Sequence, residues 1–140
     1  MQPATTRINL EFFAEGVPKP QGSKRYVGNG RFVEASDVKP WRAAIANAVF
    51  REWMQSGDAR PFTGPVKVHA TFYMPRPKTV KRLFPTVAPD LDKLQRALGD
   101  ALSVDCQAIE DDSQIIEWHS FKAYVEPGGT TGVKVKVTAL

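Results

Sequence analysis

Apolar and polar residues alternate along two stretches of this chain, which is the pattern of a half-buried β-strand. In residues 66–74 every second side chain is apolar, and in residues 133–138 valines alternate with Lys and Thr. Residues 8–13 and 115–125 are also rich in β-prone side chains. The sequence therefore predicts four main strands, and residues 32–33 add a short fifth one.

Apolar residues recur at helical spacing in two further stretches. The first helix is predicted over residues 38–54, with Ser36 as its N-cap and Gly57 ending it or starting the loop that follows. The second helix is predicted to begin after Asp90, which is its expected N-cap. The two apolar stripes consist of Trp41, Ile45, Ala48, Val49 and Trp53, and of Leu91, Leu94, Leu98, Ala101 and Leu102.

Glycine and proline separate these elements. Residues 14–31 contain four glycines and two prolines and are predicted to form a long loop. Residues 75–89 contain four prolines and four Lys or Arg residues, which predicts an exposed basic loop, and residues 127–129 predict a turn. The order of the elements favours an α+β fold, with two main helices packed on a small mixed β-sheet. We expect one domain over residues 1–140, with residues 1–7 as a flexible start.

Composition narrows the classes of function. A chain of 140 residues has the size of one domain and can bury a core without disulfides. Cys106 is the single cysteine, and we interpret it as a small buried hydrophobe in a reducing compartment. The sequence shows no apolar signal core and no run of membrane-spanning length, so no membrane partner is expected. The net charge of +4 favours an anionic partner.

Carboxylates gather in two short blocks, Asp-Leu-Asp at residues 90–92 and Glu-Asp-Asp at residues 110–112. Each block also has a structural interpretation. Asp is a favoured N-cap, and Asp92 in the first helical turn would complement the helix dipole and pair with Arg96 four residues later. A run of three acids usually forms a solvated turn.

Two features of these blocks argue for a metal site. The second block directly precedes the apolar pair at residues 115–116, so it lies at the start of a strand rather than in a tail. One helix folding back would also bring the two blocks together. Carboxylate oxygens suit Mg²⁺ or Mn²⁺, whereas His69 and His119 are interpreted as ordinary strand residues and not as zinc ligands.

Two basic segments are candidates for contact with nucleic acid. In Lys24-Arg25-Tyr26 an aromatic ring lies beside two cations in a loop that Arg31 closes, which suits phosphate contact and base stacking. The loop 75–89 presents a second set of cations, which are Arg76, Lys78, Lys81 and Arg82. Lysines also keep loops soluble, so both assignments are hypotheses. Metal-binding carboxylates in a basic chain point to phosphodiester cleavage.

At the two acidic blocks the sequence resembles the RusA family of Holliday junction resolvases, which is common in phages and prophages. The family's signature segments read DLDKLQRALGDAL and IEDDSQI in this chain, in the family's order, and the resemblance covers residues 8–138. It implies a RusA-like homodimer whose metal ligands are Asp90, Asp92 and Asp112, with Asp111 in support. The family's catalytic lysine falls at Arg96, which leaves open whether Arg96 or the neighbouring Lys93 acts as the catalytic cation.

The resemblance further implies an endodeoxyribonuclease of DNA recombination and repair that uses Mg²⁺, with Mn²⁺ as a substitute. Its substrate would be branched double-stranded DNA, a four-way junction, cut by paired symmetric incisions. We assign catalysis to Asp90, Asp92, Asp112 and Arg96, and count Lys93 among the DNA contacts. Cleavage of other branched or flap DNA, or junction binding without catalysis, are the alternatives. The expected location is the cytoplasm of a bacterial cell or of a phage-infected host.

Overall fold

The computed structural model describes residues 6–22, 25–28, 31–33 and 37–140. Its main sheet has four strands in the order β1-β6-β4-β5. These strands are β1 (Asn9–Glu15), β4 (Val66–Met74), β5 (Ile115–Tyr124) and β6 (Gly132–Ala139). Strand β4 pairs in parallel with β5, whereas the other two pairings are antiparallel. The predicted α+β class with a mixed sheet is confirmed.

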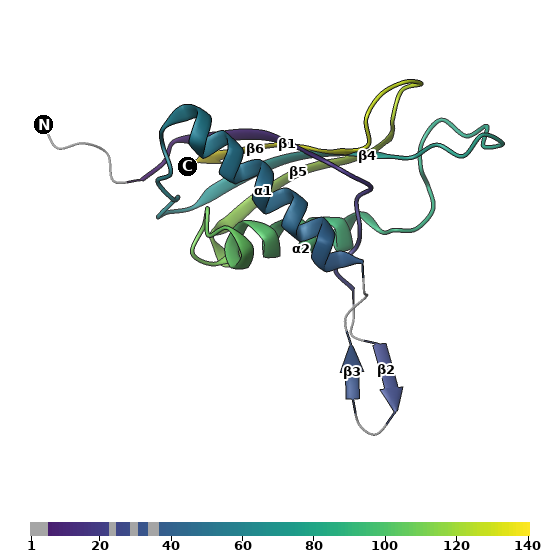
Figure 1. The fold of residues 1–140 in the computed structure, drawn as a ribbon, viewed down its shortest axis with the longest axis horizontal. Coiled ribbons are helices and arrows are strands. Elements are labelled where there is room, and N and C mark those ends of the chain that lie inside the picture. The colour runs from purple at the N-terminus through teal and green to yellow at the C-terminus, as the bar shows by residue number, and fades with distance from the viewer. Residues whose placement is uncertain (1–5, 23–24, 29–30, 34–36) are drawn as a thin grey trace, which may run out of the picture.

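Two helices cover one face of this sheet (Figure 1). Helix α1 spans Val38–Ser56, and helix α2 spans Leu91–Asp100 and continues as the π-helical turn η1 (Ala101–Asp105). The face of β4 that alternation predicted to be apolar is buried beneath them. The core also contains the apolar stripes of both helices, among them Ile45, Leu94 and Leu98.

The parallel pairing of β4 with β5 decides where the acidic residues lie. Parallel neighbours need a crossover connection, and here the loop 75–89 and helix α2 form it. The chain leaves the end of β4, runs back along the sheet in α2 and enters β5 at Ile115, which pairs with Val66. Helix α2 therefore lies antiparallel to β5, with Asp90 at its N-terminus and Asp112 near its last turn.

The prediction of a continuous loop over residues 14–31 is wrong at its start, where β1 continues to Glu15, and in its second half. Residues 25–28 form strand β2 (Arg25–Gly28), which pairs with β3 (Arg31–Val33) as an antiparallel hairpin. The short strand expected at residues 32–33 is thereby confirmed. The sequence contained the signal, because Asn29-Gly30 is a favoured pair for a two-residue hairpin turn and the flanking residues are β-prone.

The ends of the elements differ from the predictions in small ways. Ser36 lies outside the described residues, and Asp37 occupies the N-cap position of α1 without a side-chain capping bond. Gly57 ends that helix as expected, because its positive φ of 71° lets its N–H donate to the carbonyl of Trp53 at 2.9 Å. In the described part of the chain no helix combines the length and apolar character needed to cross a membrane.

Arg7 is held in the fold, although we expected it to belong to a flexible start. It is only 5% exposed, and its guanidinium pairs with Glu52 at 2.7 Å and donates to the carbonyls of Asn9 and Asp58. This partly buried ion pair ties the chain before β1 to the last turns of α1. Residues 1–5 lie outside the described residues. Cys106 is buried, and burial raises the pKa of its thiol to about 11, as its interpretation as a hydrophobe predicts.

Candidate active site

A cleft of about 230 Å³ lies between α2 and β5. Helix α2 lines it with residues spaced by three and four positions, which is the spacing of one helical face. Those residues are Asp92, Gln95, Arg96 and Gly99, and the opposite wall is formed by Asp112, Ile115 and Trp118. The cleft thus brings one residue of each acidic block to the same surface, together with a guanidinium.

Close packing at the last turn of α2 positions Asp112. A Cβ built on Gly99 would lie 3.7 Å from the Cβ of Asp112, so the helix backbone passes directly beside this acid. Asp92 lies seven residues earlier on the same helical face, which corresponds to a distance of about 10 Å along the axis. The two acids therefore occupy opposite ends of one short cleft.

Asp90 occupies the N-cap position of α2, as predicted, but its side chain makes no capping hydrogen bond. Only its backbone carbonyl serves the helix, accepting from the N–H groups of Lys93 at 3.1 Å and Leu94 at 3.2 Å. The carboxylate is exposed at the end of the loop 75–89 and does not line the cleft. The structural interpretation of this acid as a cap is therefore not supported, and its carboxylate is left available to a cation.

Asp92 does not form the expected i, i+4 pair with Arg96. Its carboxylate Oδ2 instead lies 3.4 Å from the Nζ of Lys93, and among the described residues this is the ion pair that Asp92 makes. Both acid and lysine keep substantial exposure, so the contact contributes little to stability. Arg96 remains directed at the cleft, where its charge faces the same space as Asp92 and Asp112.

Asp111 has a structural role that its neighbour Asp112 lacks. It caps the short 3₁₀ helix η2 (Asp112–Gln114), where its Oδ1 accepts from the N–H of Ser113 at 2.8 Å. This backbone bond holds the pKa of Asp111 below its usual value. The Gln114 side chain completes a capping box, accepting from the N–H groups of Glu110 and Asp111. The turn is thereby fixed so that Asp112 faces the cleft.

Gln114 also anchors this turn to the rest of the fold. Its Nε2 donates to the carbonyls of Phe62 at 3.0 Å and Gly64 at 2.8 Å, in the segment before β4. Phe62 in turn forms an isolated bridge with Ile109 and is fully buried. The residues on either side of the acidic block are therefore bonded to the rest of the fold, whereas its three acids are themselves exposed to solvent.

Asp100 is a half-buried acid near the cleft that sequence reasoning treated only as a helix residue. Burial raises its pKa above the usual value, and the negative charges of Asp112 and Asp105 add to this effect. The positive charges of Arg42 and Arg96 act in the opposite direction. The sequence signal was available, because an acid within the apolar segment Leu98–Leu102 of a helix is unusual.

The substitution Asp100→Asn is expected to stabilise the protein at pH 7 and to have little effect at pH 3. An acid with a raised pKa binds its proton more tightly in the folded state, so its contribution to folding declines as pH rises above the usual value of 3.8. The Asn variant lacks this decline. Thermal unfolding of the wild type and of Asp100→Asn at pH 7 and at pH 3 tests this prediction, with the exposed Glu126→Gln as the control. An equal shift in melting temperature at both pH values would contradict it.

The donor set in and beside the cleft fits a hard divalent cation. Asp90, Asp92 and Asp112 are exposed and offer only carboxylate oxygens, which Mg²⁺ and Mn²⁺ prefer. Among the described residues, however, no three acidic, His or Cys side chains already converge closely enough to hold an ion. The structure brings Asp92 and Asp112 to one cleft and leaves Asp90 beside it. Mutual repulsion opposes closer approach of these like charges until a cation neutralises them.

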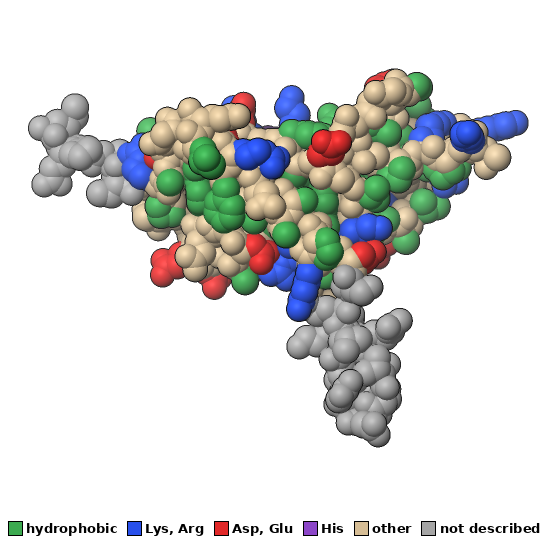
Figure 2. All heavy atoms as spheres, viewed as in Figure 1, with side chains coloured by type: hydrophobic (Ala, Val, Ile, Leu, Met, Phe, Trp, Pro, Cys, Tyr) green, Lys and Arg blue, Asp and Glu red, His purple; other side chains and the backbone are tan. Residues whose placement is uncertain are grey.

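Apart from Lys93, which is on α2, the predicted nucleic-acid contacts in the described part of the chain fall on two projections. Arg25, Tyr26 and Arg31 lie on the hairpin β2–β3, and Lys24 lies outside the described residues. The predicted basic loop 75–89 is confirmed as exposed, and Figure 2 shows Lys and Arg side chains at the projecting end of the molecule that this loop forms in Figure 1. The four cations predicted there, Arg76, Lys78, Lys81 and Arg82, are all exposed.

Two of these loop cations are tied to the end of β5. The guanidinium of Arg76 lies over the Tyr124 ring, 4.9 Å from its centroid, and the Nε of Arg82 donates to the Tyr124 hydroxyl at 2.9 Å. Lys78 and Lys81 are exposed. The loop is therefore anchored at its base while its lysines face solvent.

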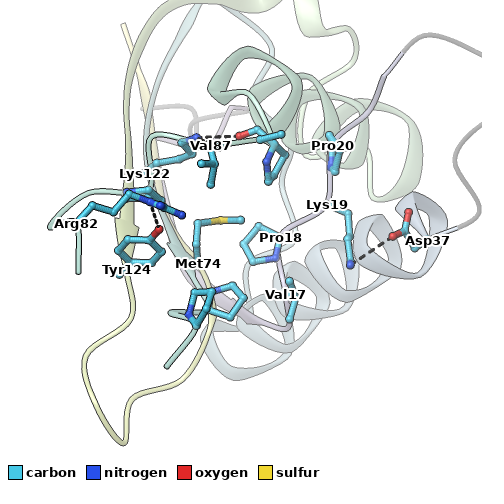
Figure 3. A pocket seen from close by; sticks show the side chains of 15 residues that line it. Val17, Pro18, Lys19, Pro20, Asp37, Met74, Arg82, Val87, Lys122 and Tyr124 are labelled. Atoms are coloured by element: carbon cyan, nitrogen blue, oxygen red, sulfur yellow. Dashed lines mark hydrogen bonds and ion pairs between the residues drawn. The ribbon is translucent and has the colours of Figure 1, made fainter. Parts of the chain in front are cut away.

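Lys122 was not singled out from the sequence, yet it fixes the chain just before Asp90. Its Nζ donates to the carbonyls of Val87 at 2.8 Å and Pro89 at 2.9 Å (Figure 3). Nothing in the local sequence marks it, because its two partners lie more than thirty residues away and offer only backbone atoms. Lys122 thus fixes the position of the end of the loop 75–89, and with it the position of Asp90 at the start of α2.

The family model described as endodeoxyribonuclease RusA matches residues 15–138. That range includes both acidic blocks, the cleft and the two basic projections. A search of curated proteins finds no match.

Proposed function

The chain belongs to the RusA family of endodeoxyribonucleases, and from this membership we propose that it resolves four-way DNA junctions by paired, metal-dependent cuts. The observation that carries the proposal is the cleft in which Asp92 and Asp112 face Arg96. Two carboxylates alone would repel a DNA phosphate. When the site also contains a guanidinium and takes up a divalent cation, the repulsion becomes an attraction for the phosphate.

Asp90, Asp92 and Asp112 are the residues that would hold Mg²⁺, or Mn²⁺ as a substitute. When bound, such an ion supplies an activated water at neutral pH and stabilises charge on the phosphate oxygens. The chain's own contribution is to position the acids: η2 fixes Asp112, and the Lys122 bonds fix the approach to Asp90. The half-buried Asp100 adds a neighbouring carboxyl whose proton is held more tightly than usual.

Arg96 is the cation that the geometry favours for contact with the scissile phosphate. It lines the cleft, whereas Lys93 pairs with Asp92 and has its backbone carbonyl bound by the N–H of Gln21 at 3.0 Å. Arginine does not release its proton in proteins, so it would stabilise charge on the phosphate and would not act as a general acid. Its planar guanidinium can contact two phosphate oxygens at once.

A homodimer in the cytoplasm of a bacterial cell or a phage-infected host completes the proposal. A two-fold dimer presents two clefts to a junction that is itself roughly two-fold symmetric, which accounts for paired symmetric cuts. The hairpin β2–β3 and the loop 75–89 project from the body of the chain (Figure 1) and would contact the DNA arms. A DNA recombination or repair role follows from this substrate.

A synthetic immobile four-way junction, compared with a matched linear duplex, tests the proposal directly. We expect paired nicks on the junction alone in the presence of Mg²⁺, and none in EDTA. Cleavage of flap or other branched DNA in preference to the junction would favour the first alternative substrate class. Binding without any cleavage, in Mn²⁺ as well, would contradict the nuclease and leave a junction-binding module.

Replacing Lys122 by Met is expected to weaken Mg²⁺ affinity more than DNA binding. Loss of the two bonds before Asp90 loosens one ligand, and changes of this supporting kind typically cost roughly 10- to 100-fold in metal affinity or activity. The measurement is the Mg²⁺ concentration at half-maximal junction cleavage, with junction affinity in EDTA as the second readout. Lys122→Arg, which can still donate to both carbonyls, should stay near wild type. An unchanged Mg²⁺ dependence in Lys122→Met would remove this residue from the site.

The double substitution Lys78→Ala with Lys81→Ala is expected to flatten the salt dependence of junction binding. Each phosphate contact contributes about 0.9 to the slope of log affinity against log salt, so the slope should fall by up to about 2. Lys134→Ala with Lys136→Ala changes the net charge equally on strand β6 and serves as the control. Equal slopes for both double variants would separate the loop from the DNA interface.

A further inference from the structure

A second cavity, of about 460 Å³, opens beside the start of α2. One wall is the segment 17–20, which follows β1, and the other is the loop 75–89, with the ends of β4 and β5 between them. Figure 3 shows Pro18 and Met74 in the middle of this pocket, with Val17 on one side and Val87 on the other. Its lining is predominantly apolar, since proline, valine and methionine side chains contribute most of it.

Cations surround this apolar space. Arg82 and Lys122 lie on the side of the loop 75–89, and Lys19 lies on the opposite side, where it pairs with Asp37 at 3.3 Å (Figure 3). Asp37 is the single acid among the lining residues. An apolar floor with a basic rim is complementary to a ligand that combines a flat apolar face with a negative charge.

The pocket adjoins the candidate active site. Its wall includes Pro89, and the next residue is Asp90. The same Lys122 that lines the pocket donates to the carbonyl of Pro89. A DNA strand whose phosphate reaches the acids at the start of α2 would therefore carry a flanking nucleotide past the mouth of this pocket.

We propose that this pocket receives one unpaired nucleobase next to the cut, with the adjoining phosphate on Arg82 or Lys19. The inference rests on the proposed nuclease function and adds to it a source of structure selectivity. A base in an intact duplex is stacked and paired and cannot enter a side pocket without leaving the helix. The branch point of a junction provides bases whose extraction costs less, so the pocket favours branched over linear DNA.

Other occupants fit the surroundings less well. A proline-rich or acidic peptide could contact the apolar floor. Peptide binding would not explain, however, why the pocket wall continues directly into Asp90 of the candidate active site. A nucleotide accounts for the apolar lining, the basic rim and the position next to the acids together. Base contacts with apolar and aromatic side chains are also tolerant of sequence, which suits a pocket without a set of directed polar groups.

Pocket-filling variants test the proposal. Val17 and Val87 line the pocket and are 41% and 48% exposed, so Val17→Trp or Val87→Trp would fill it without disturbing the core. Met54→Trp, on α1 at a position 83% exposed, is the matched control outside the pocket. Melting temperatures identify any variant that fails to fold, and the second filling variant then takes its place.

The probe is a four-way junction with 2-aminopurine at the branch point, bound in EDTA so that no cutting occurs. We expect the fluorescence to rise with wild type and Met54→Trp, and to stay at the free-junction value with the filling variants. Junction affinity should fall about 5- to 100-fold in the filling variants, with linear-duplex affinity unchanged. Equal fluorescence and affinity in all four proteins, as a peptide-binding pocket would give, would overturn the inference. In that case Mg²⁺-dependent junction cleavage by the wild type would still support the proposed function. A wild-type protein that neither binds nor cuts junctions would overturn both.

Discussion

Asp92→Asn is expected to abolish junction cleavage while leaving junction binding unchanged or tighter. The asparagine keeps the shape of the side chain but removes one of the charges that would hold the cation. Metal ions contribute several kcal/mol of transition-state stabilisation, so losing the ion corresponds to a rate loss of about 10³-fold or more. Binding does not suffer, because one negative charge facing the DNA is removed.

The measurement is the single-turnover rate of junction cleavage with Mg²⁺, paired with junction affinity in EDTA. Glu110→Gln is the matched control, since Glu110 is an exposed acid beside Asp111 and Asp112 but carries no assigned role at the metal. It should cleave at nearly the wild-type rate. A wild-type rate in Asp92→Asn would show that the metal site has been assigned to the wrong acids.

Arg96→Met is expected to lower the rate of cleavage by roughly 10²- to 10³-fold, which is the usual cost of removing one donor to developing negative charge. Arg96 lines the cleft with Asp92 and Asp112, so its charge lies where the scissile phosphate would be held. The junction affinity should change much less than the rate, because many other cations would share the contact with the DNA. Arg96→Lys should recover part of the rate.

Lys93→Met provides the comparison that identifies the catalytic cation. Lys93 follows Asp92 in sequence and its ammonium pairs with that acid, but Lys93 itself is not among the residues that line the cleft. We expect its loss to weaken DNA binding slightly and to keep most of the cleavage rate. If Lys93→Met loses the larger part of the rate and Arg96→Met does not, the role belongs to Lys93.

Local patterns in the sequence predicted the framework of the site. Alternation located β4 at residues 66–74 without error, and helical spacing placed the start of α2 after Asp90. These predictions succeed because burial of one face dictates the pattern of the residues that form it. The prediction that a helix folding back would bring the two acidic blocks together is borne out for Asp92 and Asp112, which share one cleft.

Long-range contacts explain what the sequence did not predict. The capping role of Asp90 and the pairing of Asp92 with Arg96 were inferred from local rules, yet Asp90 makes no side-chain cap and Asp92 pairs with Lys93. Where several local partners compete at similar free energy, spacing alone does not decide among them. The bonds from Lys122 to the segment before Asp90 join residues more than thirty positions apart, and no periodicity encodes them.

Local patterns in the sequence also did not predict the parallel pairing of β4 with β5. Alternation predicts which face of a strand is buried, but it does not predict whether the neighbouring strand runs parallel or antiparallel to it. Parallel pairing places α2 across the sheet and sets Asp112 beside Gly99 at the far end of the helix from Asp90. The distribution of the acids along the cleft is thus a property of topology.

Cleavage of a supercoiled plasmid that extrudes a cruciform tests the central claim most directly. The cruciform is a four-way junction, and two cuts made within one binding event convert the plasmid to a linear product, whereas independent single cuts give nicked circles. With Mg²⁺ we predict linear product from wild type and intact supercoiled plasmid in EDTA. Nicked circles as the lasting product, or equal cutting in EDTA, would contradict a metal-dependent enzyme that makes paired cuts.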